Sequence, residues 1–311
     1  MSIKIGLLGT SHVHAGSYAR ALSNHPSAEL SGHFESDPNY APKFDSTPFA
    51  SASECVAASD AVIICGKTVE HLAMIELAAQ AQKPILCEKP VPFSEQESNR
   101  IRQIVESNQV LFMTAFPCPF SPAFQSALKR IQNGEIGKLV AIAATNRARF
   151  PGLWYDDAKL SGGGAMMDHV VHVADLLRRI TGQSPNRVHA NAHPAGNEKV
   201  AMLTLDYADG TFATLDSSWS RPKSYKTWGD VTLNIVGELG VIELDLFGQT
   251  MDVYGSSLSL SGYGPDLDQF MVNEFVSAIQ EKRAPSVTLE DGLMASQVVW
   301  SAYQSLSPAS A

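Results

Sequence analysis

Three features are missing or scarce in this 311-residue sequence: long apolar runs, dense basic runs and clustered cysteines. A bilayer span needs roughly 20 consecutive apolar residues, so we expect no membrane partner. Because 32 acidic residues outnumber 23 Lys and Arg and the net charge is −9, we expect no nucleic acid partner. The chain begins directly with a strand-like pattern, without a basic and apolar leader, which favours a cytoplasmic protein.

The four cysteines, Cys55, Cys65, Cys87 and Cys118, occur singly. They show neither the spacing of zinc ligands nor a disulfide framework, so we expect them to be small buried apolar side chains. What the sequence does contain is an ordinary globular composition, 44% hydrophobic and 18% charged. The length exceeds the usual limit of a single core, which predicts two domains, with one large barrel as the alternative.

The first part of the chain alternates short apolar segments with helical patterns. Strands are expected at 3–8, 29–34, 61–65, 84–87 and 110–114. This alternation is typical of a parallel sheet with right-handed crossovers, and it predicts a doubly wound α/β domain of the Rossmann type over residues 1–119.

After the proline-rich passage 116–122 the pattern changes. Helices are expected at about 122–133, after the glycine run 162–164, and at 266–282 and 288–306. Alternation of apolar and polar residues predicts strands near 138–147, 186–194, 199–207, 211–219, 230–236, 240–246 and 250–254. We therefore expect an α+β domain over 120–311 with an open, mostly antiparallel and meandering sheet. One face of such a sheet packs on helices, and we expect a second subunit on the other face.

The first strand leads into the segment Gly9-Thr10-Ser11-His12-Val13-His14. A dinucleotide-binding turn brings pyrophosphate against backbone amides at a helix start, usually with the pattern G-x-G-x-x-G. Here only the first glycine is kept, and Ser11 and His14 occupy the other two positions. The position between strand and helix still predicts a nucleotide loop, with contacts from Gly9, Thr10, Ser11, His12 and Val13.

Glu35 ends the second strand, where a carboxylate accepts hydrogen bonds from the ribose hydroxyls and repels a 2′-phosphate. No Arg or Lys stands beside it in the sequence, so NAD is favoured and NADP is less expected. The alternative is that Glu35 is a solvated strand end.

Two further motifs are Cys87-Glu88-Lys89-Pro90 and the stretch from Gly162-Gly163-Gly164 through Asp168 and His172. In this order they resemble the Gfo/Idh/MocA family of dehydrogenases, which act mainly on sugars and polyols. The segments 61–71 and 134–138 extend the resemblance over almost the whole chain. It implies NAD or NADP, a catalytic set of Lys89, Asp168 and His172, and cofactor contacts from Cys65, Gly66, His71, Glu88 and Lys89.

The expected chemistry suits these residue types. Oxidation of a secondary alcohol requires removal of the hydroxyl proton, so His172 is the expected general base. Lys89 follows a parallel strand, where its ammonium would stabilise the developing oxyanion. Asp168 lies four residues before His172 on one helix face and would position substrate. Asp175 is either a carboxylate that orients His172 or a helix salt-bridge partner, and we favour the second.

Several other residues allow two interpretations. Arg147, Trp154, Tyr155, Asp168 and His169 are candidates for substrate contacts, and the alternative for Arg147, Trp154 and Tyr155 is strand and loop packing. The same ambiguity holds for Trp219, Arg221, Tyr225 and Trp228. His12, His14, His169 and His172 could together suit a divalent metal, but their pairs come from distant segments, so we expect no metal.

The sequence thus predicts an NAD-dependent dehydrogenase of a sugar, a polyol or a derived acid. One alternative is elimination or hydrolysis assisted by tightly held NAD, with no net redox change. Another is a regulator that binds a dinucleotide without catalysis.

Overall fold

The computed structural model describes residues 2–194, 197–254, 258–262 and 264–306. The chain forms two compact units. The first contains Met1–Pro117, Asp157–Gly162 and Asp268–Ser296, and the second contains Cys118–Asp156, Gly163–Leu267 and Gln297–Ala311. The first unit therefore gathers three separate parts of the chain, whereas the division that we expected from the sequence, 1–119 and 120–311, is contiguous.

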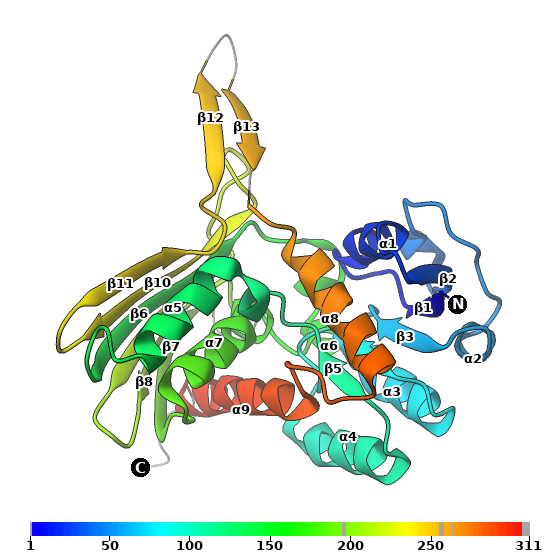
Figure 1. The fold of residues 1–311 in the computed structure, drawn as a ribbon, viewed down its shortest axis with the longest axis horizontal. Coiled ribbons are helices and arrows are strands. Elements are labelled where there is room, and N and C mark those ends of the chain that lie inside the picture. The colour runs from blue at the N-terminus through cyan, green and yellow to red at the C-terminus, as the bar shows by residue number, and fades with distance from the viewer. Residues whose placement is uncertain (1, 195–196, 255–257, 263, 307–311) are drawn as a thin grey trace. The chain divides into compact units, whose positions relative to one another are not determined.

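A five-stranded parallel sheet forms the centre of the first unit (Figure 1). Its order is β2-β1-β3-β4-β5, built from β1 (Ile3–Leu8), β2 (Ala28–Phe34), β3 (Ala61–Ile64), β4 (Ile85–Cys87) and β5 (Phe112–Thr114). Every residue of β3, β4 and β5 is buried, because such strands are covered on both faces. The predicted Rossmann-type sheet is confirmed.

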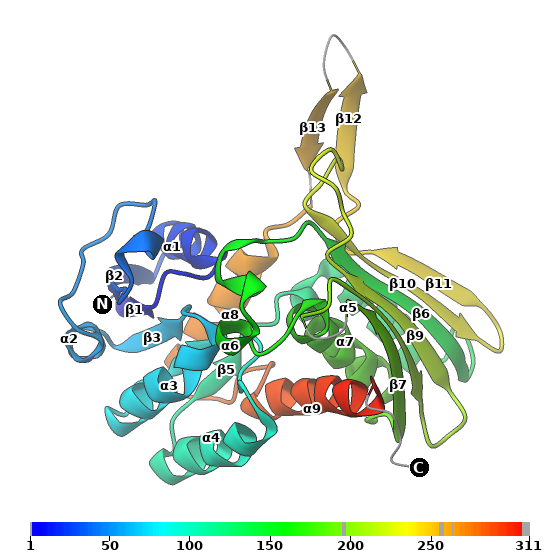
Figure 2. The ribbon, with the colours of Figure 1, turned by 180° about the vertical axis from the view of Figure 1, so that it is seen from behind.

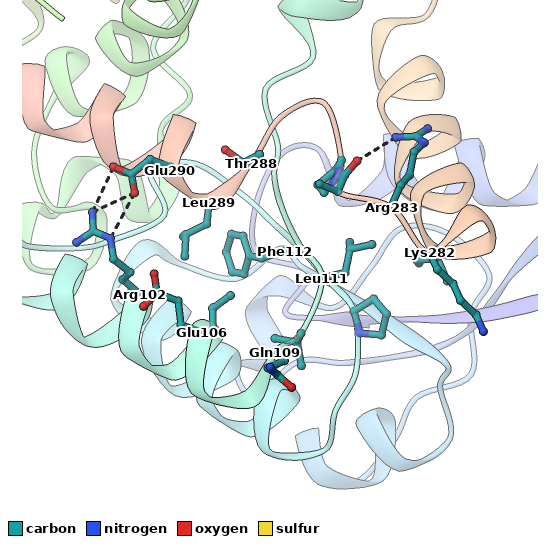
Figure 3. A pocket seen from close by; sticks show the side chains of 16 residues that line it. Arg102, Glu106, Gln109, Leu111, Phe112, Lys282, Arg283, Thr288, Leu289 and Glu290 are labelled. Carbon is teal, nitrogen blue, oxygen red and sulfur yellow. Dashed lines mark hydrogen bonds and ion pairs between the residues drawn. The ribbon is translucent and has the colours of Figure 1, made fainter.

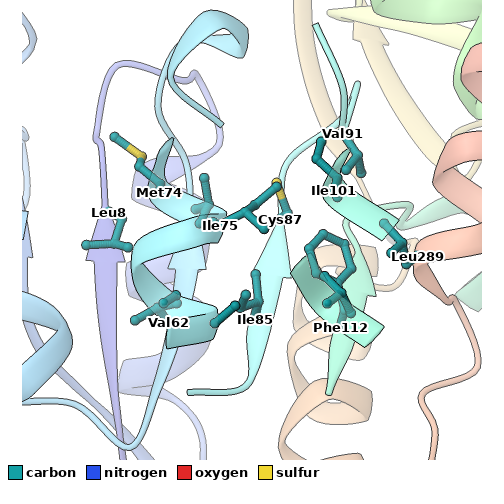
Figure 4. Packing of buried hydrophobic residues seen from close by; sticks show 14 of the residues in the cluster. Leu8, Val62, Met74, Ile75, Ile85, Cys87, Val91, Ile101, Phe112 and Leu289 are labelled. Atoms are coloured by element: carbon teal, nitrogen blue, oxygen red, sulfur yellow. The ribbon is translucent and has the colours of Figure 1, made fainter. Parts of the chain in front are cut away.

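The helices of this unit are α1 (Ala15–Ser23), α2 (Ala52–Ala57), α3 (His71–Gln80), α4 (Glu95–Asn108), α6 (Ala158–Ser161) and most of α8 (Leu267–Glu281). Ile75 from α3 and Ile101 from α4 pack against Ile85 and Phe112 of the sheet in one cluster (Figure 4). Burying each such side chain contributes roughly 1.5–3 kcal/mol. All four cysteines are buried, as expected.

The second unit contains a six-stranded sheet of order β11-β10-β6-β9-β8-β7. Its strands are β6 (Leu139–Ala148), β7 (Arg187–His193), β8 (Val200–Asp206), β9 (Phe212–Ser218), β10 (Gly229–Gly237) and β11 (Val241–Asp245). Two details of the expected meander are wrong. β6 lies between β10 and β9 and pairs in parallel with β9, because the chain passes through helices before it returns to the sheet. β12 (Thr250–Tyr254) leaves the sheet and pairs with β13 (Leu258–Gly262) in a separate hairpin.

Helices α5 (Pro122–Gln132) and α7 (Val171–Thr181) lie on one side of this sheet (Figure 2). The last part of α9 (Leu289–Leu306) belongs to the same unit, where the Ser305 hydroxyl accepts a hydrogen bond from the Ala190 amide. Within the described residues no helix covers the opposite side, and Ala143, Thr204 and Thr214 are exposed there. None of the described helices is both long and apolar enough to cross a membrane.

Candidate active site

The turn after β1 requires glycine at its first position. Gly9 has φ of +82°, and a Cβ on it would lie 2.4 Å from Gly66 Cα, in the segment after β3. The two backbones therefore approach each other more closely than any side chain would permit. This close approach at the carboxyl ends of β1 and β3 forms the kind of cradle that a dinucleotide needs, so the residues present fit the predicted cofactor loop.

The rest of the loop leads into α1. Ser11 and His12 are buried, and the His12 amide donates to the Cys65 carbonyl at 3.1 Å. Val13 is exposed, and His14 is the N-cap residue of α1. The first turn of α1 holds no acidic residue that would compete with a phosphate for the backbone amides of this helix start.

Glu35 is tied to this loop rather than to solvent. Its carboxylate accepts the Thr10 amide at 2.7 Å and the Asp37 amide at 3.0 Å. The alternative of a solvated strand end is therefore wrong, and Glu35 fixes the start of the phosphate loop.

A lysine distant in sequence comes close to the same region. The Lys67 ammonium lies 3.4 Å from Asp37 Oδ2 and 3.8 Å from Glu70 Oε1. This lysine was not predicted, because only the residues next to Glu35 in the sequence were considered. Asp37 and Glu70 pair with this cation, and the Glu35 carboxylate accepts the Asp37 amide, so carboxylates outnumber cations here.

Glu88 is a fully buried carboxylate directly after β4. Its Oε1 lies 2.8 Å from His14 Nδ1 and 3.3 Å from His12 Nδ1, and it accepts the Tyr18 hydroxyl. Its Oε2 accepts the Lys89 amide at 3.0 Å. Burial would raise the pKa of Glu88, but the two histidines outweigh this and hold the pKa well below its ordinary value. Glu88 is therefore ionised at neutral pH.

The adjacent Lys89 is 4% exposed and begins the Lys-Pro segment at the carboxyl end of β4. His71, the first residue of α3, contacts the Pro90 carbonyl through Nδ1 at 3.0 Å. Burial lowers the pKa of His71, so the ring is neutral and donates its Nδ1 proton to that carbonyl. His71 thus supports the segment that carries Lys89.

Metal-ligand atoms of His12, Cys65 and Glu88 lie within 4.8 Å of one another. Only His12 belongs to the four histidines considered from the sequence. Glu88 Oε1 already contacts His14 Nδ1 and accepts the Tyr18 hydroxyl.

A cavity of about 600 Å³ lies elsewhere in the first unit (Figure 3). It opens at the amino ends of β4 and β5, beside the ion pair of Arg102 and Glu290. Open α/β sheets bind their ligands at the carboxyl ends of the strands. The candidate nucleotide site is therefore the Gly9 loop and not this cavity.

In the second unit, glycines allow two side chains to pack under a short π-helix (Met166–Val170). A Cβ on Gly164 would lie 2.1 Å from the Glu198 carbonyl oxygen, and one on Gly163 would lie 2.2 Å from the Tyr303 hydroxyl. The Glu198 carboxylate accepts the Met166 amide at 2.8 Å and the Tyr303 hydroxyl at 3.0 Å. Glu198, which sequence reasoning missed, thus caps the helical stretch that carries Asp168 and His172.

The carboxylate of Asp168 is held by Trp219 and lies beside His169. Its Oδ2 accepts the Trp219 indole N–H at 3.0 Å and lies 3.2 Å from His169 Nε2. His169 Nδ1 donates to the Asn146 carbonyl at 3.0 Å, which fixes the ring. The π-turn directly precedes α7, and a spacing of four residues still leaves Asp168 and His172 on one face.

The other predicted substrate residues contact other residues of the second unit, by hydrogen bonds or by stacking. Arg147 donates to Asp230 at 2.8 Å, and Arg221 and Tyr225 bond to the same carboxylate. Trp154 and Tyr155 are buried and stack with ring centres 4.0 Å apart. Asp175 pairs with Arg179 at 2.9 Å, so the interpretation of Asp175 as a helix salt-bridge partner is confirmed.

The structure brings the predicted cofactor residues together within the first unit, and it brings Asp168, His169 and His172 together on one segment of the second. Besides Lys67, two residues of these sites were not predicted. Tyr18 had a weak signal, since it lies four residues after His14 on α1. Glu198 had none, because it stands in a loop without a motif.

Comparison with known proteins identifies the family. A model described as an oxidoreductase family with an NAD-binding Rossmann fold matches residues 3–116, and a model of the GFO/IDH/MocA C-terminal domain matches residues 124–243. An uncharacterized oxidoreductase of Bacillus subtilis is 29% identical over 79% of this chain and 76% of the relative. Myo-inositol 2-dehydrogenase of Thermotoga maritima is 26% identical over 79% of this chain and 77% of that enzyme.

A third relative has a different named activity. The 2,7-anhydro-N-acetylneuraminate hydratase of Escherichia coli is 24% identical over 94% of this chain and 79% of that enzyme. Among solved structures, GenD2 from gentamicin A biosynthesis in complex with NAD has the same fold, with a TM-score of 0.89, 19% identity and coverage of 99% of this chain and 95% of that one. The chain belongs to the Gfo/Idh/MocA family of oxidoreductases and carries its NAD-binding Rossmann fold.

Proposed function

We propose that this protein is an NAD-dependent dehydrogenase that transfers hydride between nicotinamide and a secondary hydroxyl of a sugar, a polyol or a derived acid. The observation that carries the proposal is the placement of Lys89. It is a buried lysine at the carboxyl end of β4, in the same unit as a fitted dinucleotide loop. Relatives named as inositol dehydrogenases support the substrate class.

Bound NAD would supply the hydride acceptor, and the protein residues would manage the proton. His172 would take the hydroxyl proton while the hydride leaves the same carbon. The Lys89 ammonium would stabilise negative charge on the substrate oxygen. Asp168, held by the Trp219 indole, would accept hydrogen bonds from neighbouring hydroxyls.

The proposed contacts to NAD divide into two groups. Residues of the loop and strand ends would touch it directly, and buried residues would hold the loop in place. The first group is Gly9, Thr10, Ser11, His12, Val13, Glu35, Gly66 and Lys89, and the second is Cys65, His71 and Glu88. NAD is proposed over NADP because Lys67, the cation near Glu35, is already paired with the two carboxylates of Asp37 and Glu70.

The proposed substrate contacts are Arg147, Trp154, Tyr155, Asp168 and His169. Among these, Asp168 and His169 have the most suitable setting, since they combine a carboxylate and an imidazole at 3.2 Å with aromatic rings nearby. Arg147 would reach substrate only if it released part of its contact with Asp230.

We further propose that residues 1–119 act as the nucleotide-binding domain and residues 120–311 as the domain for substrate binding and oligomerisation. The exposed Thr204, Thr214 and Ala143 pair side by side across three strands of the second sheet, which suits contact with a second copy. Four buried thiols are consistent with a reducing compartment, so a cytoplasmic location is proposed.

A second candidate is elimination or hydration assisted by retained NAD, with no net redox change. It is favoured by one observation, the likeness to the named hydratase over 94% of this chain. A regulator without catalysis has no comparable support, because Lys89, Asp168 and His172 are all present.

The test is a screen of sugars and polyols with NAD, followed by absorbance of NADH. We expect NADH to accumulate with at least one polyol. Lys89→Ala should lower kcat by about 10²-fold or more while the Kd for NADH stays within a few-fold. Unchanged turnover would contradict the assignment of Lys89, and product formation without NADH, by protein that retains NAD, would favour the second candidate.

A further inference from the structure

The nucleotide loop replaces two glycines of the usual pattern with Ser11 and His14, and His14 has an unusual environment. It stands at the N-cap of α1, where the pyrophosphate of a dinucleotide is expected. Its Nδ1 lies 2.8 Å from the fully buried Glu88 carboxylate. The ring nevertheless keeps 28% of its side-chain surface exposed. The Nδ1 edge of the ring is therefore held by buried Glu88, while another part of the ring reaches the surface.

The partner of Nδ1 determines where the His14 protons are. Glu88 is ionised, and a carboxylate without a proton only accepts hydrogen bonds. His14 Nδ1 must therefore carry a proton. In a neutral ring this leaves a bare lone pair on Nε2, which repels a phosphate oxygen. Only the doubly protonated imidazolium can donate from Nε2 to an anion.

The surroundings of His14 favour the imidazolium. Burial would lower the pKa of His14, and Lys89 adds to this effect, but Glu88 and Asp268 outweigh both and raise the pKa above its ordinary value of 6.5. Asp268 comes from α8 and accepts the Ser17 hydroxyl at 2.6 Å. The titratable and charged groups around the ring are Glu88 and Lys89 after β4, Asp268 of α8, Tyr18 and Arg20 of α1, His12 of the loop and Cys65 after β3.

We propose that His14 is a ligand of the cofactor pyrophosphate, donating a hydrogen bond from Nε2 as an imidazolium, and that Glu88 is the positioning residue that orients and charges it. The inference rests on the proposed binding of NAD at the Gly9 loop. In this loop a charged side chain thus takes over a position where the usual pattern has a glycine. The contribution of this hydrogen bond to pyrophosphate affinity is then full below the pKa of His14 and is lost as pH rises through it.

The experiment uses two probes that differ in the proposed contact. ADP-ribose carries the pyrophosphate, and adenosine carries the same base and ribose without it. His14→Asn keeps an amide that can reach Glu88 but has nothing at the Nε2 position. We expect this variant to bind ADP-ribose about tenfold more weakly by calorimetry at pH 6.5, with adenosine affinity unchanged. His25→Asn, beyond the end of α1, is the matched control and should change neither.

The pH profile separates this role from a merely structural one. The diphosphate diester of ADP-ribose does not titrate near neutrality, so a fall in wild-type affinity with rising pH reports the protein. We expect that fall in the wild type and its absence in His14→Asn. In Glu88→Gln the fall should move to lower pH, because the carboxylate that stabilises the imidazolium is gone. Thermal unfolding of each variant checks that it is folded.

Three results would overturn the inference. The first is equal ADP-ribose affinity in wild type and folded His14→Asn. The second is a pH dependence that persists in His14→Asn. The third is loss of binding on chelation with recovery on added Zn²⁺, which would make His12, Cys65 and Glu88 a metal site instead. Failure of the wild type to bind NADH at all would instead contradict the proposed function.

Discussion

Each unit contains a buried carboxylate, and the two carboxylates differ in exposure and in hydrogen-bond partners. In the first, Glu88 is fully buried and receives hydrogen bonds or close contacts from two imidazoles, a phenol and an amide. In the second, Asp168 keeps 8% of its surface exposed and accepts an indole N–H beside one imidazole. Glu88 is satisfied within the protein and serves to hold the loop. Asp168 keeps a small exposed part, which suits its proposed contact with substrate hydroxyls.

The two sheets also differ in how far their strands are buried. All strands of the first sheet are parallel, and its three strands β3, β4 and β5 are buried throughout. The second sheet alternates buried and exposed residues, and its exposed face carries small and polar side chains together with the apolar Met202 and Phe212. The first sheet is therefore a fully covered support for the loops at its strand ends, whereas the second sheet also offers an exposed face.

The largest expected effect concerns the proposed base in the second unit. His172→Asn should lower kcat by about 10²–10⁴-fold, because no imidazole then accepts the hydroxyl proton. The Kd for NADH, set by the first unit, should change little. His189→Asn, at an exposed position of β7, is the control. Equal losses of kcat and of NADH affinity would contradict the division of roles between the units.

Substitutions at two glycines with positive φ distinguish the cost of backbone strain from the cost of a steric clash. Gly9 has φ of +82° with no room for a Cβ, whereas Gly210, in the second unit, has φ of +90° with nothing within 4 Å. Gly210→Ala should cost only the strain of about 1–2 kcal/mol. Gly9→Ala should cost at least about 3 kcal/mol and abolish NADH binding, because its Cβ meets the Gly66 backbone. Chemical denaturation measures both, and similar costs would show that the approach of Gly9 to Gly66 is not essential.

The proposed oligomerisation through the exposed face of the second sheet can be tested by placing a charge on that face. Thr214→Arg places a cation at the centre of that face, so a homo-oligomer formed through it should dissociate with a Kd about tenfold higher or more. Sedimentation of the wild type and the variant measures this. Ser107→Arg on exposed α4 is the control. An assembly that tolerates Thr214→Arg but loses subunits with Ser107→Arg would place the interface elsewhere.

The smallest effect concerns acid stability. Burial would raise the pKa of Asp230, but hydrogen bonds from Arg221 and Arg147 outweigh this and lower it below its ordinary value of 3.8. A carboxyl with a lowered pKa stabilises the fold above its unfolded pKa, and this contribution is lost as pH falls. The wild type should therefore unfold at a higher temperature than Asp230→Asn at pH 7, with the gap closing toward pH 3. A gap independent of pH would contradict this ion-pair account.

Much of the fold follows from local patterns. Continuous apolar runs predicted β1 to β5, and alternation predicted β6 to β11, because both patterns report burial along a single strand. The parallel pairing of β6 with β9 was not predictable in this way, since the pattern of either strand is the same whichever neighbour it has. The departure of β12 into a hairpin has the same cause.

The site was predictable where a motif is continuous in sequence. The loop from Gly9 and the segment with Lys89 were recognised, and the structure places both at strand ends of one sheet. The contact of His14 with Glu88 was not recognised, because the two residues come from different strand ends and neither pattern names the other. Lys67 beside Asp37 was missed for the same reason.

The four buried thiols can report local unfolding of the two units, because an alkylating reagent reaches them only when they become exposed. Cys55, Cys65 and Cys87 belong to the first unit and Cys118 to the second. Burial raises the pKa of Cys55 to about 12 and that of Cys65 well above its ordinary value, so in the folded protein these two thiols present almost no thiolate to an alkylating reagent. Labelling rates read by mass spectrometry would then time the opening of each unit separately, without any engineered probe.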